Sequence, residues 1–309
     1  MSKNPLVIQI PAAPIVEIQH EILQNRQVSL HLLREDLNHP LIQGNKFRKL
    51  KYNLIEAHAQ GHQTLLTFGG AYSNHIHATA AAGKAFGFKT IGVIRGDELK
   101  NKPRNATLKE AEQMGMKLHF VTRKDYRRKS QDYFIDDLHD LFGDFYLVPE
   151  GGTNDFAIKG CEEILHAGTQ DFDYIVCAMG TAGTFTGILK SSNPHQKVLG
   201  FPALMDCEFL LETVKKYTDK TNYEIINAFH FGGFGKFNRD LISFVNDFKE
   251  NQKVQLEPLY TGKMLFGILD LVEKGYFQPE SKILAVHTGG LQGIKGFNER
   301  FKNKYNIDF

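Results

Sequence analysis

The sequence predicts an α/β protein of two lobes, each built on an open parallel sheet. Helical and strand patterns alternate from about residue 52, in the order YNLIEAHAQG, TLLTFGG, SNHIHATAAAGKAFG, KTIGVIRG, ATLKEAEQMG and KLHFVT. Each predicted helix ends near a glycine, Gly61, Gly87 or Gly115, that can adopt the left-handed C-terminal conformation. The length of 309 residues, 42% of them hydrophobic, is enough to fill two cores. We therefore expect βαβ units with right-handed crossovers.

The second half of the chain repeats this pattern more loosely. The runs DYIVCAMG, QKVLGFPAL and KILAVHTGG predict buried strands, and CEEILHAGTQ, Asn238 to Phe248 and KMLFGILDLVEKG predict helices. No repeat of about 20–50 residues and no Pro/Gly/Ser linker separates the halves, so the lobes should pack around a cleft, with a boundary near residues 149–155. Ligands of such sheets bind beyond the C-terminal ends of the strands.

Composition argues against several classes of function. The 37 basic residues nearly balance the 35 acidic ones, so no nucleic-acid or membrane partner is indicated. Three scattered cysteines, Cys161, Cys177 and Cys207, suit neither a disulfide framework nor a structural metal site. No apolar run has the length of a membrane span and the N-terminus lacks the layout of a signal peptide, so we expect a cytoplasmic protein without a metal.

Lys46 is the first candidate for chemistry. In LIQGNKFRKLKYN it follows Gly44 and Asn45 at the predicted start of a helix. A lone lysine there is commonly a solvated residue of the first turn. The alternative is a buried amine whose lowered pKa makes it a nucleophile or a base toward a carbonyl carbon.

A second segment, TLLTFGGAYSNHIHATAAAG, places Ser73, Asn74 and His75 just after a predicted strand. Serine and asparagine are common N-cap residues, so helix capping alone explains them. The functional alternative is that this helix start binds a substrate carboxylate while Ser73 relays a proton.

A third segment, DYIVCAMGTAGTFTGIL, runs from a strand through small residues into a helix. Such a loop offers several backbone N–H donors and two hydroxyls to a monophosphate. It matches neither a Walker loop nor the pattern G-x-G-x-x-G, and a tight turn without a ligand is the alternative. The loop residues are Gly180, Thr181, Ala182, Gly183 and Thr184.

Two further segments are rich in glycine. One is FHFGGFGKFNRD, with Phe231 to Gly235, and the other is the pair PLYTGKM and LAVHTGGLQG, with Tyr260, Thr261 and Thr288. Glycines permit close approach of the backbone to a ligand. Read alone, Tyr260 is also explained as a core tyrosine and Thr288 as a hydroxyl at the end of a strand.

The motifs GNKFRKLKYN, FGGAYSNHIHATAAAG, the 180–184 loop, PLYTGKM and HTGG occur in one order over most of the chain. In this order the sequence resembles the 1-aminocyclopropane-1-carboxylate deaminase and D-cysteine desulfhydrase family. The resemblance implies the tryptophan synthase β subunit fold, that of fold type II pyridoxal-phosphate enzymes, with bound pyridoxal 5'-phosphate and a homodimer. It implies a larger cofactor-binding domain of residues 1–48 and 155–309 and a smaller domain of residues 49–154.

The resemblance also implies roles for individual residues. Lys46 matches the Schiff-base lysine, Asn74 the asparagine beside the ring hydroxyl and Ser73 the serine near the substrate carboxylate. Residues 180–184 match the phosphate cup, and Thr288 matches the residue facing the pyridine nitrogen. The remaining expected contacts with a small amino-acid substrate come from His75, Phe234 and Tyr260.

Two positions favour one branch of this family. Deaminase-like members resemble PVYEGK and HLGG where this chain has Thr261 and Thr288, so no carboxylate is expected to hold the pyridine nitrogen protonated. The sequence therefore favours β-elimination, which yields an α-keto acid and ammonia, as in D-cysteine desulfhydrase. The family pattern GYG reads GFG here, so Phe234 lacks a tyrosine hydroxyl. The alternatives are ring opening of 1-aminocyclopropane-1-carboxylate and a pyridoxal-phosphate-binding protein without useful turnover.

Overall fold

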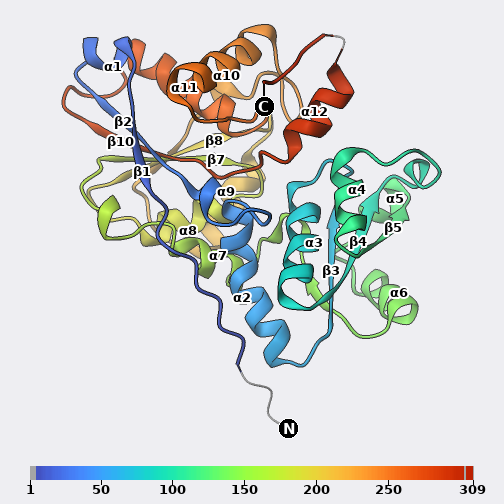
Figure 1. Cartoon of the computed structure of the whole chain (residues 1–309). Helices are drawn as coiled ribbons and strands as arrows, with labels where there is room; N and C mark the ends of the chain where they lie inside the picture. Colours follow the sequence, from blue (N-terminus) through green and yellow to red (C-terminus); the bar gives the residue numbers. More distant parts are fainter. Residues whose placement is uncertain (1–4, 303, 309) are drawn as a thin grey trace.

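The computed structural model describes residues 5–302 and 304–308, and the strands in them form two sheets (Figure 1). The larger sheet has the order β1-β2-β10-β7-β8-β9 and the smaller the order β5-β4-β3-β6. The described strand pairs are parallel apart from β1 with β2. The strands are β1 (Ile15–Ile18), β2 (Ser29–Leu33), β3 (Thr64–Gly69), β4 (Lys89–Arg95), β5 (Met116–Val121), β6 (Tyr146–Val148), β7 (Tyr174–Met179), β8 (Lys197–Pro202), β9 (Tyr223–Ile225) and β10 (Lys282–Val286).

Helices cover both faces of the larger sheet, because its central strands are apolar on both sides. In β7, Val176 and Ala178 belong to one core and Ile175, Cys177 and Met179 to the other, as strand alternation requires. The helices that contribute to the first core are α1 (Glu21–Asn25), α10 (Arg239–Gln252), α11 (Thr261–Glu273) and α12 (Gly293–Phe301), and those of the second are α7 (Asp155–Glu162), α8 (Gly183–Ser191) and α9 (Glu208–Tyr217).

The smaller sheet is covered on both faces in the same way. Leu65 of β3 packs in one core, and Leu66 and Phe68 pack in another. The first face carries α2 (Asn45–Ala59), α3 (Asn74–Phe86) and α4 (Ala106–Gln113), and the second carries α5 (Arg123–Tyr126) and α6 (Asp132–Phe142). The predicted α/β architecture with parallel sheets is therefore confirmed.

Helix α2 lies between the two sheets (Figure 1). A Cβ placed on Gly160 of α7 would lie 1.9 Å from the carbonyl oxygen of Arg48, so α2 and α7 are in direct backbone contact. On its other side, Leu50 and Leu54 share a core with Leu65 of the smaller sheet. The proposed domain boundary after residue 48 falls inside α2, and the domain division stays a prediction.

The predicted helix over CEEILHAGTQ is wrong in its position. Helix α7 begins at Asp155, because the Asn154 side chain accepts from the backbone N–H of Ala157 and caps the helix there. It ends at Glu162, and His166 and Thr169 then form a capping box that opens a separate short 3-10 turn. The polar cap residues therefore determine where the helix begins and ends, and the spacing of apolar residues on which the prediction depended does not.

The N-terminal strands β1 and β2 were not predicted. Strand β2 lies inside the larger sheet, antiparallel to β1 and parallel to β10. It pairs Leu32 with Ala285 and Leu33 with Val286, which brings the N-terminal segment next to the HTGG motif. The three predicted helix-ending glycines do have positive φ values, of +86° for Gly61, +77° for Gly87 and +95° for Gly115. No helix among the described residues has the length and apolarity needed to cross a membrane.

Gly44 fixes the start of α2, and substituting it should destabilise the protein strongly. Its φ is +67°, and an added Cβ would lie 1.9 Å from the carbonyl oxygen of Thr288. We expect Gly44→Ala to lower the free energy of unfolding by about 2–5 kcal/mol, from backbone strain and overpacking together. Urea denaturation measures this change.

Gly61→Ala is the matched control for this substitution. Gly61 also has a positive φ, +86°, but nothing lies within 4 Å of a Cβ added to it. We expect it to cost only about 1–2 kcal/mol, the backbone strain alone. Equal losses in the two variants would show that the Gly44–Thr288 contact contributes nothing.

Candidate active site

Several helix N-termini meet where the parallel strands of both sheets end. Helices α2, α3, α8, α11 and α12 begin there, and three contacts tie them together. The Asn45 N–H donates to the carbonyl of Thr288 at 3.2 Å. A Cβ on Gly290, just before α12, would touch the Asn74 amide, and one on Gly180 would touch the Tyr260 ring. Helix N-termini carry partial positive charge, so the place where these helix starts meet, called the cleft below, favours anions.

Lys46 is the second residue of α2 and lies in this cleft. Its side chain is half-buried by area, and its ammonium donates to the Asn45 side-chain oxygen at 3.2 Å. Burial, followed by the charge of Lys49, lowers the pKa of Lys46 to about 7. A solvated first-turn lysine would not have this environment. The structure therefore favours the interpretation as a reactive amine.

Lys49 lies one turn further along α2, and the sequence prediction missed it. Its ammonium donates to the Gly151 carbonyl at 2.9 Å and to the hydroxyls of Thr153 and Thr181 at 3.0 and 3.2 Å. All three acceptors are neutral oxygens, and burial lowers its pKa. The sequence could have indicated Lys49, because it follows Lys46 by three residues and therefore lies on the same helix face.

The 180–184 loop has the geometry of an anion cradle. Ala182 is the N-cap of α8 with a left-handed φ of +59°, which turns the chain sharply into the helix. A Cβ on Gly183 would lie 2.7 Å from the Thr153 hydroxyl and 3.1 Å from the Lys49 ammonium. Only a glycine leaves that space open. The residues present therefore fit a phosphate held by a helix N-terminus, hydroxyls and one ammonium.

Asn45 links the two parts of this cradle. Its amide nitrogen donates to the Thr184 hydroxyl at 2.8 Å, while its oxygen accepts from Lys46. Two neighbouring side chains of α2 are thereby fixed relative to the start of α8. The sequence prediction gave Asn45 no role beyond preceding Lys46.

Ser73 caps α3, so the structural explanation for this residue is confirmed. Its oxygen accepts from the backbone N–H of Ile76 at 3.3 Å. The cap uses a lone pair, so the hydroxyl proton can still be donated into the cleft. The Asn74 oxygen accepts from Gln292 at 2.7 Å, which leaves the Asn74 NH₂ group as its donor.

His75 is a buried histidine at the start of α3. It is 2% exposed, and among the described residues its ring faces the Pro149 backbone without a well-formed hydrogen bond. Burial, followed by the charges of Lys46 and Lys49, holds the pKa of His75 well below its usual value. The ring is therefore neutral and can donate one hydrogen bond and accept another.

Tyr260 and Phe234 lie together at the rim of the cleft. Tyr260 is the N-cap of α11, and its hydroxyl would be 3.5 Å from a Cβ on Gly180. Burial, with the charges of Glu257 and Glu150, raises the pKa of Tyr260, so the phenol stays protonated. The Phe234 ring is 5.9 Å from the Tyr260 ring and is 54% exposed.

The two threonines expected to decide the reaction differ in surroundings. Thr288 follows β10, and its carbonyl holds the start of α2. The buried Thr261 hydroxyl instead contacts Glu257, which the sequence prediction missed. The Glu257 carboxylate accepts from three backbone N–H groups at the start of α11, those of Leu259, Tyr260 and Thr261. Glu257 is therefore a helix cap, although it is a carboxylate in the cleft wall.

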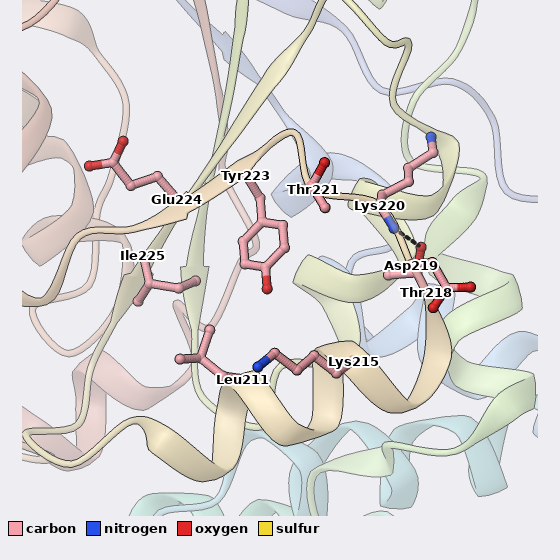
Figure 2. A pocket seen from close by; sticks show the side chains of 9 residues that line it. All are labelled: Leu211, Lys215, Thr218, Asp219, Lys220, Thr221, Tyr223, Glu224 and Ile225. Atoms are coloured by element: carbon pink, nitrogen blue, oxygen red, sulfur yellow. Dashed lines mark hydrogen bonds between the residues drawn. The ribbon is translucent and has the colours of Figure 1, made fainter.

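A hollow among the described residues lies elsewhere. It has a volume of about 580 Å³ and is bounded by α9 and β9 at the edge of the larger sheet (Figure 2). Lys215, Tyr223 and Glu224 line it, and none of the predicted site residues does. The site is therefore identified from its converging helix N-termini and buried amines rather than from this hollow.

Comparison with known proteins agrees with this geometry. Residues 9–289 match the family model for pyridoxal-phosphate dependent enzymes. The chain belongs to this family. The cofactor is therefore pyridoxal phosphate, and the lysine and anion cradle described above fit its aldehyde and phosphate.

Individual relatives carry more specific names. The chain is 28% identical to a Pyrococcus abyssi protein provisionally named 1-aminocyclopropane-1-carboxylate deaminase, over 97% of this chain and 96% of that protein. It is also 28% identical to the Arabidopsis thaliana mitochondrial bifunctional D-cysteine desulfhydrase/1-aminocyclopropane-1-carboxylate deaminase, over 86% of this chain and 73% of that protein. The resemblance seen in the motifs is thus confirmed over nearly the whole chain.

Solved structures agree on the fold. The crystal structure of a homologue of 1-aminocyclopropane-1-carboxylate deaminase superposes with a TM-score of 0.82 at 26% identity, covering 96% of this chain and 95% of that one. Serine racemase from Dictyostelium discoideum has a TM-score of 0.68 at 17% identity, covering 91% and 93% of the two chains. The second likeness concerns the fold alone.

The cradle makes Lys49 a testable cofactor ligand. Replacing Lys49 with Met removes the ammonium while keeping the length of the side chain. We expect the Kd for pyridoxal phosphate to rise about 10–100-fold, the effect of losing a charge-assisted contact. Titration of the apoprotein with the cofactor, followed by visible absorbance, measures this.

Lys51→Met provides the control. Lys51 is on the same helix, but its ammonium pairs with Glu163 at 2.7 Å, away from the cradle. Its loss should change the Kd by less than about threefold. A Lys49→Met variant that binds the cofactor as tightly as Lys51→Met would contradict the assignment.

Proposed function

We propose that this protein catalyses a pyridoxal-phosphate-dependent β-elimination from a small amino acid, with D-cysteine as the expected substrate. The net reaction consumes D-cysteine and water and releases pyruvate, ammonia and hydrogen sulfide. The observation that carries the proposal is that Thr288 contacts the start of the helix that carries Lys46, while the carboxylate of Glu257 is engaged as a helix cap. A hydroxyl partner for the ring nitrogen favours a short-lived carbanion that expels a leaving group.

Lys46 would hold the cofactor and move the α-proton. When bound, pyridoxal phosphate supplies an aldehyde that condenses with amines and a ring that withdraws electrons from the α-carbon. A pKa of about 7 leaves the free Lys46 amine substantially neutral near neutral pH. Such an amine can act as nucleophile and can accept a proton from the α-carbon.

Ser73, Asn74 and His75 would orient the substrate. The Ser73 hydroxyl proton, the Asn74 NH₂ group and one His75 nitrogen remain available as donors at the start of α3. A carboxylate at this helix start would be stabilised by the donors and by the helix dipole. Tyr260, kept protonated by burial, would donate a proton to the leaving group.

Ring opening of 1-aminocyclopropane-1-carboxylate is the second candidate. The name of the Pyrococcus abyssi relative favours it, whereas the bifunctional Arabidopsis thaliana relative carries both activities in its name. Ring opening needs protic or nucleophilic help at the rim of the cleft, where this chain offers Tyr260 but only a phenyl ring at Phe234. We therefore place this reaction second.

A substrate panel distinguishes the candidates. Purified protein should be yellow and should release sulfide and keto acid from D-cysteine faster than from L-cysteine. It should release keto acid from D-cysteine faster than from D-serine or L-serine, and it should also release keto acid from β-chloro-D-alanine, whose chloride is a good leaving group. Lys46→Ala should be colourless and at least about a hundredfold slower, because the nucleophile is lost. Lys51→Ala, altered on the same helix, should remain yellow and active.

The other outcomes of the substrate panel would support one of the alternative functions or contradict the role of Lys46. Keto acid from 1-aminocyclopropane-1-carboxylate at a higher kcat/KM than from D-cysteine would establish the second candidate. A yellow protein that releases keto acid from no member of the panel would support a cofactor-binding protein without useful turnover. A yellow Lys46→Ala variant would contradict the role of Lys46.

Phe234→Tyr tests why ring opening is disfavoured. The substitution adds one hydroxyl to a ring that is already 5.9 Å from Tyr260. We expect kcat/KM for 1-aminocyclopropane-1-carboxylate to rise about 100-fold relative to that for D-cysteine, the lower end of the range for one added acid–base group. Phe234→Leu, which adds no hydroxyl, is the control. An equal change of kcat/KM in both variants would show that the missing hydroxyl at position 234 does not disfavour ring opening.

The assembly and the location remain predictions as well. The family resemblance supports a homodimer, and the described helices contain no membrane span. We accordingly propose a cytoplasmic homodimer whose larger domain comprises residues 1–48 and 155–309. Light scattering of the purified chain tests the dimer.

A further inference from the structure

The loop from His230 to Gly235, here called the rim loop, has a backbone that needs external support. Phe231, Gly232, Gly233 and Gly235 all have positive φ values, of +54°, +91°, +109° and +72°. Within the loop, the N–H of Gly232 bonds to the His230 ring and that of Gly233 to the His230 carbonyl. A segment so rich in left-handed backbone gains little stability from its own conformation.

Lys263 supplies this support from α11. Its side chain is almost fully buried, with 3% of the residue exposed. The ammonium donates to the His230 carbonyl at 2.8 Å and to the Gly233 carbonyl at 3.0 Å, so it bridges both sides of the turn. A buried ammonium is costly, and here its hydrogen bonds go to carbonyls of this loop.

The rim loop in turn places Phe234 against Tyr260. The two rings are 5.9 Å apart, and the Tyr260 hydroxyl lies beside Gly180 of the phosphate cradle. Tyr260 and Lys263 are three residues apart at the start of α11, so one helix turn fixes both the phenol and the support of the loop that covers it.

We propose that Lys263 is a positioning residue that clamps the rim loop, and thereby Phe234, over the substrate side of the cleft. The expected effect on kinetics rests on the proposed function. The contact between Lys263 and the rim loop does not depend on that function. Without the ammonium, the rim loop would open and substrate would bind less tightly, while Lys46 and the phosphate cradle would remain intact.

The clamp should depend on the charge of Lys263. Burial lowers the pKa of Lys263 to about 8, and the charge of Glu257 opposes this lowering. A neutral amine is a weaker donor than an ammonium, so the clamp weakens as the pH rises through about 8. The other titratable groups near the loop are His230, Lys236, Glu257 and Tyr260. An arginine at position 263 would stay charged throughout this range.

The test uses the holoenzyme with Lys263→Met, Lys263→Arg and, as control, Lys236→Met, which removes a lysine next to the loop. Chymotrypsin, which cuts after phenylalanine, reports opening of the loop at Phe231 and Phe234, with its rate normalised on a small peptide at each pH. KM and kcat for D-cysteine and the visible absorbance of the lysine-bound cofactor are measured on the same samples.

For Lys263→Met we expect cleavage of the rim loop about tenfold faster than in the wild type, and KM raised about tenfold with a smaller change in kcat. The cofactor absorbance should persist, and Lys236→Met should behave as the wild type. Cleavage of the wild type should accelerate from about pH 7 to about pH 9, while that of Lys263→Arg stays constant.

Three results would overturn the proposal. One is cleavage and KM of Lys263→Met within about twofold of the wild type. Another is loss of cofactor absorbance together with activity, since this would indicate a role in the whole fold. The third is a cleavage rate of Lys263→Arg that rises from about pH 7 to about pH 9 as steeply as that of the wild type, since a permanent charge at position 263 would then not hold the loop. Because cleavage needs no turnover, an absence of D-cysteine activity would count against the proposed function and not against the clamp.

Discussion

The structure depends on two amines buried one turn apart on α2. Lys46 and Lys49 both have lowered pKa values, chiefly because the protein removes water from them. The hydrogen bonds described for both go to neutral oxygens, at Asn45, Gly151, Thr153 and Thr181. Burying such charges is unfavourable unless an anion accompanies them. The phosphate of the cofactor, bound among several helix N-termini, would offset this imbalance.

The need to hold both amines at the anion site explains why α2 lies between the two sheets. Its first turn must reach the end of β10, where Gly44 contacts Thr288, and also the loop after β6, where Lys49 binds Gly151. Contacts between α12 and the helices α3 and α4 connect the larger sheet to the smaller sheet. Glu299 of α12 accepts from the first N–H of α4, and Lys295 shares Glu110 with His77 of α3. The cleft is thus bounded by elements of both sheets, each of which supplies part of the anion site.

The sequence was sufficient to predict features that depend on local residue patterns and on the order of the motifs along the chain. Strand–loop–helix transitions at Gly69, Met179 and Thr288 follow from apolar runs that end in glycines and hydroxyls, and these transitions are in the structure. Thr153 and Glu257 escaped prediction, because Thr153 acts through partners far away in the sequence and Glu257 acts through a helix start that only the fold defines. Lys49 was missed although its position three residues after Lys46 indicates the same helix face. The position of α7 was wrong for a related reason, since one polar cap outweighed a weak apolar period.

The role of Glu257 shows how a carboxylate can be present in such a site without determining its chemistry. Its charge acts on Lys46 and raises the pKa of Tyr260, so it contributes to the electrostatics of the cleft. Its oxygens, however, are occupied by three backbone N–H groups and the Thr261 hydroxyl. Turning Glu257 toward a ring nitrogen would leave the start of α11 without its cap, and the same turn of α11 carries Tyr260 and Lys263. The geometry of the Tyr260 phenol and of the rim loop therefore depends on this carboxylate staying in place as a helix cap.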